Sequence, residues 1–184
     1  FGEMIPSFSD AVGGTVWCFE PVTESYILAN KCLARNECAN VMLFNAALSD
    51  KTEMRRINTH AHSGTDRAEH LGGMAFIGET GRPVPAMMLD QFTFDGLQVI
   101  HLDIEGHELP ALLGARETIR KHAPLVLIED NKSACTAFLT ELGYRLHGVT
   151  PEFWLWISDL RPDHRRILDE WLTTKNTRAA FPKR

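Results

Sequence analysis

Short apolar runs alternate with segments of helical periodicity along most of the chain. The runs have the length of strands and cover residues 15–19, 41–44, 97–103, 124–129, 144–149 and 153–157. Apolar positions spaced three and four apart predict helices from Pro21 to about Asn36, over 109–119, over 132–142 and over 162–172. Strands that alternate with helices indicate an α/β fold, with a mostly parallel sheet and helices on both of its faces.

Burial and strand direction follow from the same pattern. The run 41–44 is continuously apolar, so we expect it to be buried on both faces of a parallel sheet. The connection 149–152 is too short for a crossover helix, so the strands 144–149 and 153–157 are expected to be antiparallel neighbours that close the sheet.

Four leucine and isoleucine positions mark one face of the predicted helix over 109–119: Leu109, Leu112, Leu113 and Ile119. In the last helix the side chains expected to face the core are Ile167, Leu168, Trp171 and Leu172. We expect the segment 159–184 to consist of this helix and a solvated tail.

Residues 49–80 interrupt the alternation. The segment is polar and carries His60, His62 and His70, and it predicts an excursion with a hairpin or a mobile loop. Long loops in compact domains are often functional, and we expect this one to be a lid over a substrate site.

The chain has 184 residues, and we expect them to form a single domain over 1–184. Its 44% hydrophobic and 23% charged residues exclude a disordered or fibrous chain. A formal net charge of −5 gives no basic surface for nucleic acid, and no apolar run approaches the roughly 20 residues that span a bilayer. We therefore predict neither a nucleic-acid partner nor a membrane partner, and the sequence indicates no particular oligomeric state.

The cysteines Cys18, Cys32, Cys38 and Cys135 lack the spacing of a zinc site. We interpret them as free, buried thiols, which are typical of a reducing compartment. Since nothing at Phe1 resembles a secretory signal, we expect a cytoplasmic protein.

Polar residues follow four of the predicted strands, where α/β sheets bind their ligands. Glu20 ends the first strand and could accept hydrogen bonds from both hydroxyls of a ribose; alternatively, it interacts with the dipole of the next helix. Asn45, Ala46 and Ala47 follow the second strand, where small residues would permit a close approach of an adenine ring or would simply pack a turn.

The densest cluster is Asp103-Ile104-Glu105-Gly106-His107-Glu108. On a strand, Asp103 and Glu105 would share one face, and Gly106 would turn the chain into a helix that has His107 and Glu108 in its first turn. Two carboxylates and an imidazole could supply a general base. The alternative is that these carboxylates cap the helix.

Glu129, Asp130 and Asn131 end the neighbouring strand. Together with Asp103, Glu129 and Asp130 could form an oxygen-rich pocket for Mg²⁺. Capping of the helix over 132–142 by Asp130 or Asn131 explains the same residues without a metal.

Taken together, the motifs resemble the FkbM-type family of S-adenosylmethionine-dependent methyltransferases. The matching segments are CFEP (18–21), the helix with Asn30 and Asn36, NAALSD (45–50), LDQF (89–92), LDIEGHE (102–108), ALLGA (111–115) and LIED (127–130). They follow the family's order, and LDIEGHE followed by ALLGA is the most specific. The resemblance implies a Rossmann-like class I methyltransferase fold, S-adenosylmethionine as cofactor, and methylation of a hydroxyl on a sugar or other small metabolite.

The resemblance also implies roles for particular residues. Glu20 would hold the ribose of the cofactor, Pro21 would also contact the cofactor, and residues 45–47 would border its adenine. Asp103 and Glu105 would face the reacting methyl group and the acceptor. O-methyltransferases of this fold that act on macrolide sugars hold a divalent metal with carboxylates at these two strand ends, which favours the Mg²⁺ interpretation.

Two features depart from the family pattern. The family begins with a strand and a glycine-rich turn, and the sequence opens at Phe1-Gly2-Glu3, in the tail of that turn. Gly2 would thus contact the cofactor, and we expect the missing strand to precede Phe1, since without it the sheet would lack its middle strand. The lysine that usually precedes the Asp-x-Glu-Gly motif is His101 here.

The expected reaction is an in-line transfer, because the sulfonium of the cofactor is already activated. His107 or Asp103 would remove the proton of the acceptor, unless a bound metal lowers the pKa of the acceptor hydroxyl. One alternative is a nicotinamide-dependent reductase, since Glu20 also suits that ribose, although no complete GxGxxG is present. Another is a non-catalytic binding module that uses Trp154, Trp156 or Trp171.

Overall fold

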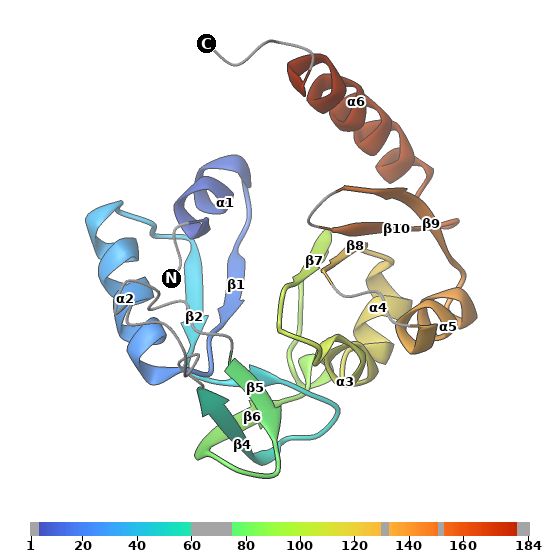
Figure 1. Cartoon of the computed structure of the whole chain (residues 1–184). Coiled ribbons are helices and arrows are strands. Elements are labelled where there is room, and N and C mark those ends of the chain that lie inside the picture. Colours follow the sequence, from blue (N-terminus) through green and yellow to red (C-terminus); the bar gives the residue numbers. More distant parts are fainter. Residues whose placement is uncertain (1–3, 60–74, 130–132, 151–152, 180–184) are drawn as a thin grey trace. The chain divides into compact units, whose positions relative to one another are not determined.

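The computed structural model describes residues 4–59, 75–129, 133–150 and 153–179 (Figure 1). The chain divides into two compact units. Unit 1 is drawn from Phe1–Phe92 and Ile104–Ala115, and unit 2 from Thr93–Asp103 and Arg116–Arg184.

Unit 1 contains two sheets. Its elements in chain order are α1 (Ile5–Ala11), β1 (Val16–Phe19), α2 (Thr23–Arg35), β2 (Val41–Phe44), β3 (Ala47–Leu48), β4 (Glu53–Thr59), β5 (Ala75–Gly78), β6 (Arg82–Met87), the 3₁₀ helix η1 (Leu89–Gln91) and α3 (Glu108–Leu113). Strands β1 and β2 are parallel, and α2 packs against β2. The other sheet has the order β3-β6-β4-β5, with β4 antiparallel to both of its neighbours. Within 49–80, where a hairpin or a mobile loop was expected, β4 and β5 form an antiparallel pair, and the residues that connect them lie outside the described part of the chain.

Aromatic side chains hold β1 and β2 together. Trp17 and Phe19 lie two positions apart on β1, and both stack on Phe44 of β2, with ring centroids 5.6 and 5.0 Å away. Phe92 meets the rings of Trp17 and Phe19 edge-on at 5.4 and 5.7 Å. Because side chains two apart on a strand share a face, this cluster fixes which face of β1 is covered.

Unit 2 contains one sheet with the order β7-β8-β10-β9. Its elements are β7 (Val99–Leu102), α4 (Arg116–His122), β8 (Leu125–Ile128), α5 (Ser133–Glu141), β9 (Tyr144–Val149), β10 (Trp154–Ser158) and α6 (Pro162–Ala179). Strands β7 and β8 are parallel, whereas β10 is antiparallel to both β8 and β9. The predicted antiparallel closing pair is therefore confirmed. Leu155 and Ile157 of β10 pack with Leu168 of α6 in the core.

The α/β class is confirmed, but the predicted single, mostly parallel sheet is not: the described residues form three sheets, and the two larger ones mix parallel and antiparallel strands. The parallel pairs β1–β2 and β7–β8 belong to different sheets. Among the described residues, β1 pairs only with β2 and β7 only with β8, so each parallel pair has a strand at the edge of its sheet.

Two predictions in unit 1 were wrong in detail. Pro21 does not occupy the first turn of α2, which begins at Thr23 after the N-cap residue Val22. The reason is that the Glu20 carboxylate accepts the Val22 N–H at 2.8 Å and turns the chain before the helix starts. Strand β2 is not buried on both faces, since Met42 is 45% exposed.

The single helix predicted over 109–119 is two helices, α3 and α4, separated at Gly114 and Ala115. Leu112 and Ile119 are buried as expected, but Leu113 is exposed. In α6, Leu168 is buried, whereas Ile167 is 49% exposed and does not face the core. The helix also continues beyond the predicted end, to Ala179.

Of the tryptophans considered for a binding module, Trp156 of β10 is buried in the core and Trp154 is half-buried. All four cysteines are free thiols; Cys135 is buried and the others are half-buried. In the part of the chain that the structure describes, no helix has the length and apolar character needed to cross a membrane. Several predictions lie outside the described residues: Gly2, His60, His62, His70, Asp130, Asn131 and the side chains of Trp171 and Leu172.

Candidate active site

The carboxyl ends of β1 and β2 are tied together by Asn45. Its Nδ2 donates to the backbone oxygens of Glu20 at 2.9 Å and Pro21 at 3.3 Å, and its Oδ1 accepts from Thr23 Oγ1 at 3.2 Å. The Glu20 N–H in turn donates to Phe44 O at 2.9 Å. The structure thus brings together three of the residues predicted to bind the cofactor, Glu20, Pro21 and Asn45, within unit 1.

The Glu20 side chain is half-buried beside this junction. Burial raises the pKa of its carboxyl group, and the hydrogen bond from Val22 N–H to Oε1 acts in the opposite direction. Within the described part of the chain, the hydrogen bond from Val22 engages Oε1, and Oε2 could accept a hydrogen bond from a ligand hydroxyl. Ala46 and Ala47 are buried, Ala46 in the bend after β2 and Ala47 in β3, so contact with a bound ring would come from the backbone or from Asn45.

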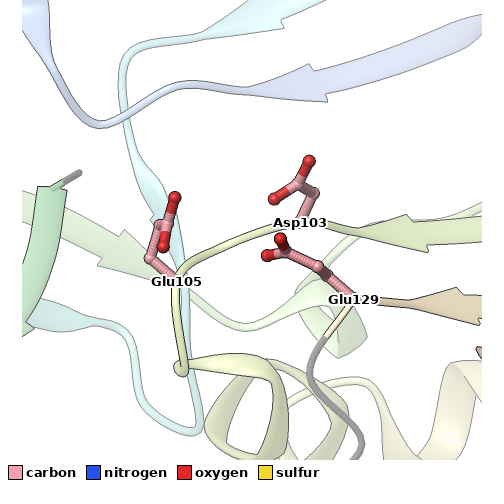
Figure 2. A group of neighbouring side chains, drawn as sticks. All are labelled: Asp103, Glu105 and Glu129. Atoms are coloured by element: carbon pink, nitrogen blue, oxygen red, sulfur yellow. The ribbon is translucent and has the colours of Figure 1, made fainter. Parts of the chain in front are cut away.

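Three carboxylates gather where the chain leaves β7 and β8 (Figure 2). Asp103 follows β7 and Glu129 follows β8, and the Glu129 N–H donates to Leu102 O at 3.0 Å, which keeps the two strand ends level. One carboxylate oxygen from each of Asp103, Glu105 and Glu129 lies within 4.8 Å of the others. This is the ligand chemistry that Mg²⁺ prefers. Asp103 and Glu129 therefore lie close together, whereas Asp130, the third predicted ligand, lies outside the described residues, and the metal stays a prediction.

The reason given for the closeness of Asp103 and Glu105 was wrong. Strand β7 ends at Leu102, so the two residues do not share a strand face. Glu105 instead has a left-handed backbone with φ of 56°, followed by Gly106 with φ of 87°. It is this turn that carries the Glu105 carboxylate to the side of Asp103, two positions earlier in the chain.

Glu108 binds the turn that precedes α3, a helix whose N-cap residue is His107 and which has no side-chain cap. It is 1% exposed, and its Oε1 accepts the backbone N–H groups of Ile104 at 3.3 Å and Gly106 at 3.2 Å. The buried carboxylate therefore holds the turn that presents Glu105 and begins α3. Its side chain is used by the fold rather than being available to a substrate.

His107 is half-buried at the N-cap of α3, and its Nε2 lies 3.1 Å from the Oγ of Ser49. Burial lowers the pKa of His107, the charge of Arg55 lowers it further, and Asp50 opposes both effects. Ser49 Oγ also donates to Asp50 Oδ1 at 3.0 Å, and Arg55 pairs with the same oxygen at 2.9 Å. The predicted base is thus one end of a polar chain within unit 1.

Sequence reasoning assigned no role to Ser49, Asp50 or Arg55. Ser49 and Asp50 were visible as the end of the NAALSD motif, but nothing in their spacing connects them to a histidine 58 positions later. Gly114 explains the connection, because a Cβ there would stand 1.9 Å from Ser49 O. The glycine of ALLGA therefore allows α3 to approach the backbone of residues 49–50.

His101, where the family pattern has a lysine, lies in unit 2. Its ring meets Phe153 edge-on at a centroid distance of 4.6 Å. Burial lowers the pKa of His101, opposed by the charge of Asp103. His101 is therefore a packed imidazole whose environment disfavours the protonated ring. It does not replace the permanent positive charge of the lysine in the family pattern.

Comparison with known proteins agrees with this arrangement of motifs. The chain matches the methyltransferase FkbM domain over residues 3–169, and it belongs to this family. It is also similar to the crystal structure of a methyltransferase FkbM from Methylobacillus flagellatus KT, with 22% identity and a TM-score of 0.54. The match covers 78% of this chain and 36% of the other, so the chain spans about a third of that protein. None of the curated proteins compared with the chain matches it.

Proposed function

We propose that the protein is an S-adenosylmethionine-dependent methyltransferase that methylates a hydroxyl group of a sugar or another small metabolite. The observation that carries the proposal is the match to the FkbM methyltransferase domain over residues 3–169. We further propose that units 1 and 2 belong to one Rossmann-like methyltransferase domain, with the segment 49–80 as its substrate lid.

The residues at the ends of β1 and β2 support the proposal of S-adenosylmethionine as the cofactor. An adenosyl group needs an acceptor for its ribose hydroxyls, and the half-buried Glu20 carboxylate, fixed through Val22 N–H, offers one. Asn45 holds the neighbouring strand end at the same level. S-adenosylmethionine would supply a methyl group on a sulfonium, and the chain would bind and orient it through Glu20, Pro21 and residues 45–47, with Gly2 as a further contact.

The neighbouring carboxylates of Asp103 and Glu129 would bind a divalent cation such as Mg²⁺, with Asp130 as a further candidate ligand. Such an ion would supply Lewis-acid chemistry at the acceptor oxygen. Asp103 and Glu105 would orient the acceptor hydroxyl, and His107 or Asp103 would take its proton. In these roles the protein only positions the acceptor and removes the proton of its hydroxyl.

The proposal is tested with the chain as it stands. Titration calorimetry with S-adenosylhomocysteine and, separately, with NAD tells a methyltransferase from a nicotinamide-dependent reductase. We expect the first to bind and the second not to bind; the reverse would overturn the proposal. Transfer of labelled methyl from S-adenosylmethionine to a panel of sugars and hydroxylated metabolites then separates an enzyme from a non-catalytic module.

The metal is tested by the same transfer assay after treatment with EDTA, followed by addition of Mg²⁺. Loss of turnover and its recovery would support the ion, whereas unchanged turnover would remove it from the mechanism. The proposed cytoplasmic location is supported by the four free thiols.

A further inference from the structure

A chain of four polar side chains in unit 1 ends at His107. His107 Nε2 lies 3.1 Å from Ser49 Oγ, Ser49 Oγ lies 3.0 Å from Asp50 Oδ1, and that oxygen lies 2.9 Å from a terminal nitrogen of Arg55. Ser49 is 0% exposed, so water does not compete for its hydroxyl. Three successive hydrogen bonds therefore connect these four side chains, and each bond restricts the orientation of the next side chain.

The direction of these bonds follows from counting protons. Burial acts to raise the pKa of Asp50, but hydrogen bonds from Ser49 and the backbone, together with the charges of Arg55 and Lys51, outweigh it, so the pKa lies below its usual value and the carboxylate is ionised at neutral pH. An ionised carboxylate only accepts hydrogen bonds, and a serine hydroxyl has a single proton to donate. Ser49 therefore donates to Asp50, and its oxygen lone pair faces His107.

The opposite assignment leaves an unfavourable contact. If the Ser49 hydroxyl donated to His107, two oxygen lone-pair regions would face each other 3.0 Å apart beside the negative charge of Asp50. Arg55 adds to the preference, because its cation holds the same Asp50 oxygen in place. The bond to Ser49 is therefore satisfied only when Nε2 of His107 carries a proton.

We infer that Ser49, held by Asp50 and Arg55, is a positioning residue that fixes neutral His107 as the Nε2–H tautomer and leaves Nδ1 as its proton-accepting atom. Among the described residues, no hydrogen bond engages Nδ1 of His107. The inference deepens the proposed function, on which the catalytic use of Nδ1 rests, but the tautomer itself is a property of the fold. It requires no cofactor, metal or substrate.

The tautomer is read directly by long-range ¹H–¹⁵N correlation spectra of protein with ¹⁵N-labelled histidine, at a pH where the ring is neutral. A His107→Gln variant assigns the signal among the 8 histidines. We expect a protonated-nitrogen shift at Nε2 and an unprotonated one at Nδ1. A wild-type His107 with the proton on Nδ1 would overturn the inference, whatever the protein's activity.

Three variants test the cause. Ser49→Ala removes the hydroxyl with little change in volume, and the His107 signals should move toward a mixture of tautomers. Asp50→Asn keeps Ser49 but allows its hydroxyl to reverse, and should also give a mixture. Ser158→Ala is the matched control: it removes a buried serine hydroxyl that belongs to unit 2 rather than unit 1, and it should leave the ¹⁵N shifts of His107 unchanged. Unaltered signals in both Ser49→Ala and Asp50→Asn would reject the inferred role of Ser49.

The transfer assay then connects the tautomer to catalysis. We expect Ser49→Ala to lower kcat about tenfold with little change in the KM for S-adenosylmethionine, and Ser49→Thr, which restores a hydroxyl, to recover it. A shifted tautomer with unchanged kcat would overturn the use of Nδ1 as the base. Absence of any methyl transfer by the wild type would count against the proposed function, while the spectra still decide the tautomer.

Discussion

At the scale of single residues, Glu20 is the group whose replacement should affect the cofactor most selectively. Glu20→Gln keeps the size of the side chain and the bond from Val22 N–H, but removes the charge of the acceptor. Charge-assisted hydrogen bonds contribute about 1.5–3 kcal/mol, so the Kd for S-adenosylhomocysteine should rise about 10- to 100-fold in calorimetry. Glu24→Gln, four positions later on the exposed face of α2, serves as the control, and an equal loss of affinity there would contradict the assignment.

Asp103 should affect turnover rather than cofactor binding. It is exposed at the end of β7, so Asp103→Ala is expected to fold normally. Removal of a general base or of a metal-binding carboxylate should lower kcat by about 10²-fold or more, with affinity for S-adenosylhomocysteine mostly intact. The matched variant is Asp95→Ala, an exposed aspartate before the same strand. Equal turnover by wild type and Asp103→Ala would exclude Asp103 from the mechanism.

Residues at strand ends could be predicted because a strand's length and direction fix where its last side chain lies. That reasoning found the Glu20–Asn45 junction and the pairing of Asp103 with Glu129. It could not find the Ser49–His107 contact, which depends on the close approach of two backbones far apart in the sequence. The prediction that Glu20 and Asp103 line one rim joins residues of the two units, and it stays a prediction.

At the scale of elements, Gly114 decides how α3 meets the segment 49–50. A Cβ at this position would stand 1.9 Å from Ser49 O and 2.9 Å from Ser49 C, both backbone atoms that cannot turn away. Gly114→Ala should therefore destabilise the protein by about 1–3 kcal/mol or more, measured by urea unfolding. Gly78→Ala, where a Cβ meets nothing within 4 Å, should change stability far less. Similar losses in the two variants would show that the close approach is not what matters.

Tyr144, the first residue of β9, anchors this strand in unit 2. Its hydroxyl donates to the buried Pro124 O at 2.7 Å, and burial raises the pKa of the phenol. A raised folded-state pKa means that stability is fully present below the unfolded-state pKa of about 10 and is lost as the pH rises above it. Wild type should lose stability above about pH 10 more steeply than Tyr144→Phe.

The same variant gives a second measurement at neutral pH. Tyr144→Phe leaves Pro124 O without its donor, so urea unfolding at pH 7 should show a loss of about 1–3 kcal/mol. Tyr26→Phe, on α2 of unit 1, controls for the loss of a phenol. Parallel alkaline curves for wild type and Tyr144→Phe would refute a role for the buried hydroxyl.

Elements were predictable to the extent that their signal is local. The periodicity of α2 and the turn after α5, where Gly143 has φ of 79°, are properties of short segments. The division of 109–119 into α3 and α4 is not, because it depends on what Gly114 packs against. Ile167 shows the same limit: its spacing suits the buried face of α6, but the packing of β10 on Leu168 leaves it exposed.

At the scale of the whole molecule, the two units are interleaved along the chain. Unit 1 takes Ile104–Ala115 from between the two segments of unit 2, so the chain passes from one unit to the other three times. Helix α3, with the buried Leu112, is connected directly to β7 on one side and to α4 on the other. Neither unit can therefore unfold without releasing a segment whose covalent neighbours belong to the other unit.

This connectivity predicts one cooperative unfolding transition, in agreement with the single domain expected from the sequence. Tryptophan fluorescence distinguishes the units, since Trp17 belongs to unit 1 and the other three tryptophans, Trp154, Trp156 and Trp171, belong to unit 2. The Trp17→Phe variant keeps only tryptophans of unit 2, and a Trp154→Phe/Trp156→Phe/Trp171→Phe triple variant keeps only Trp17 of unit 1. Urea curves of both variants should each show a single transition of the same steepness, and calorimetric and van't Hoff enthalpies of the wild type should agree. Two separated transitions, one reported by each set of tryptophans, would mean that the units fold independently despite sharing three chain crossings.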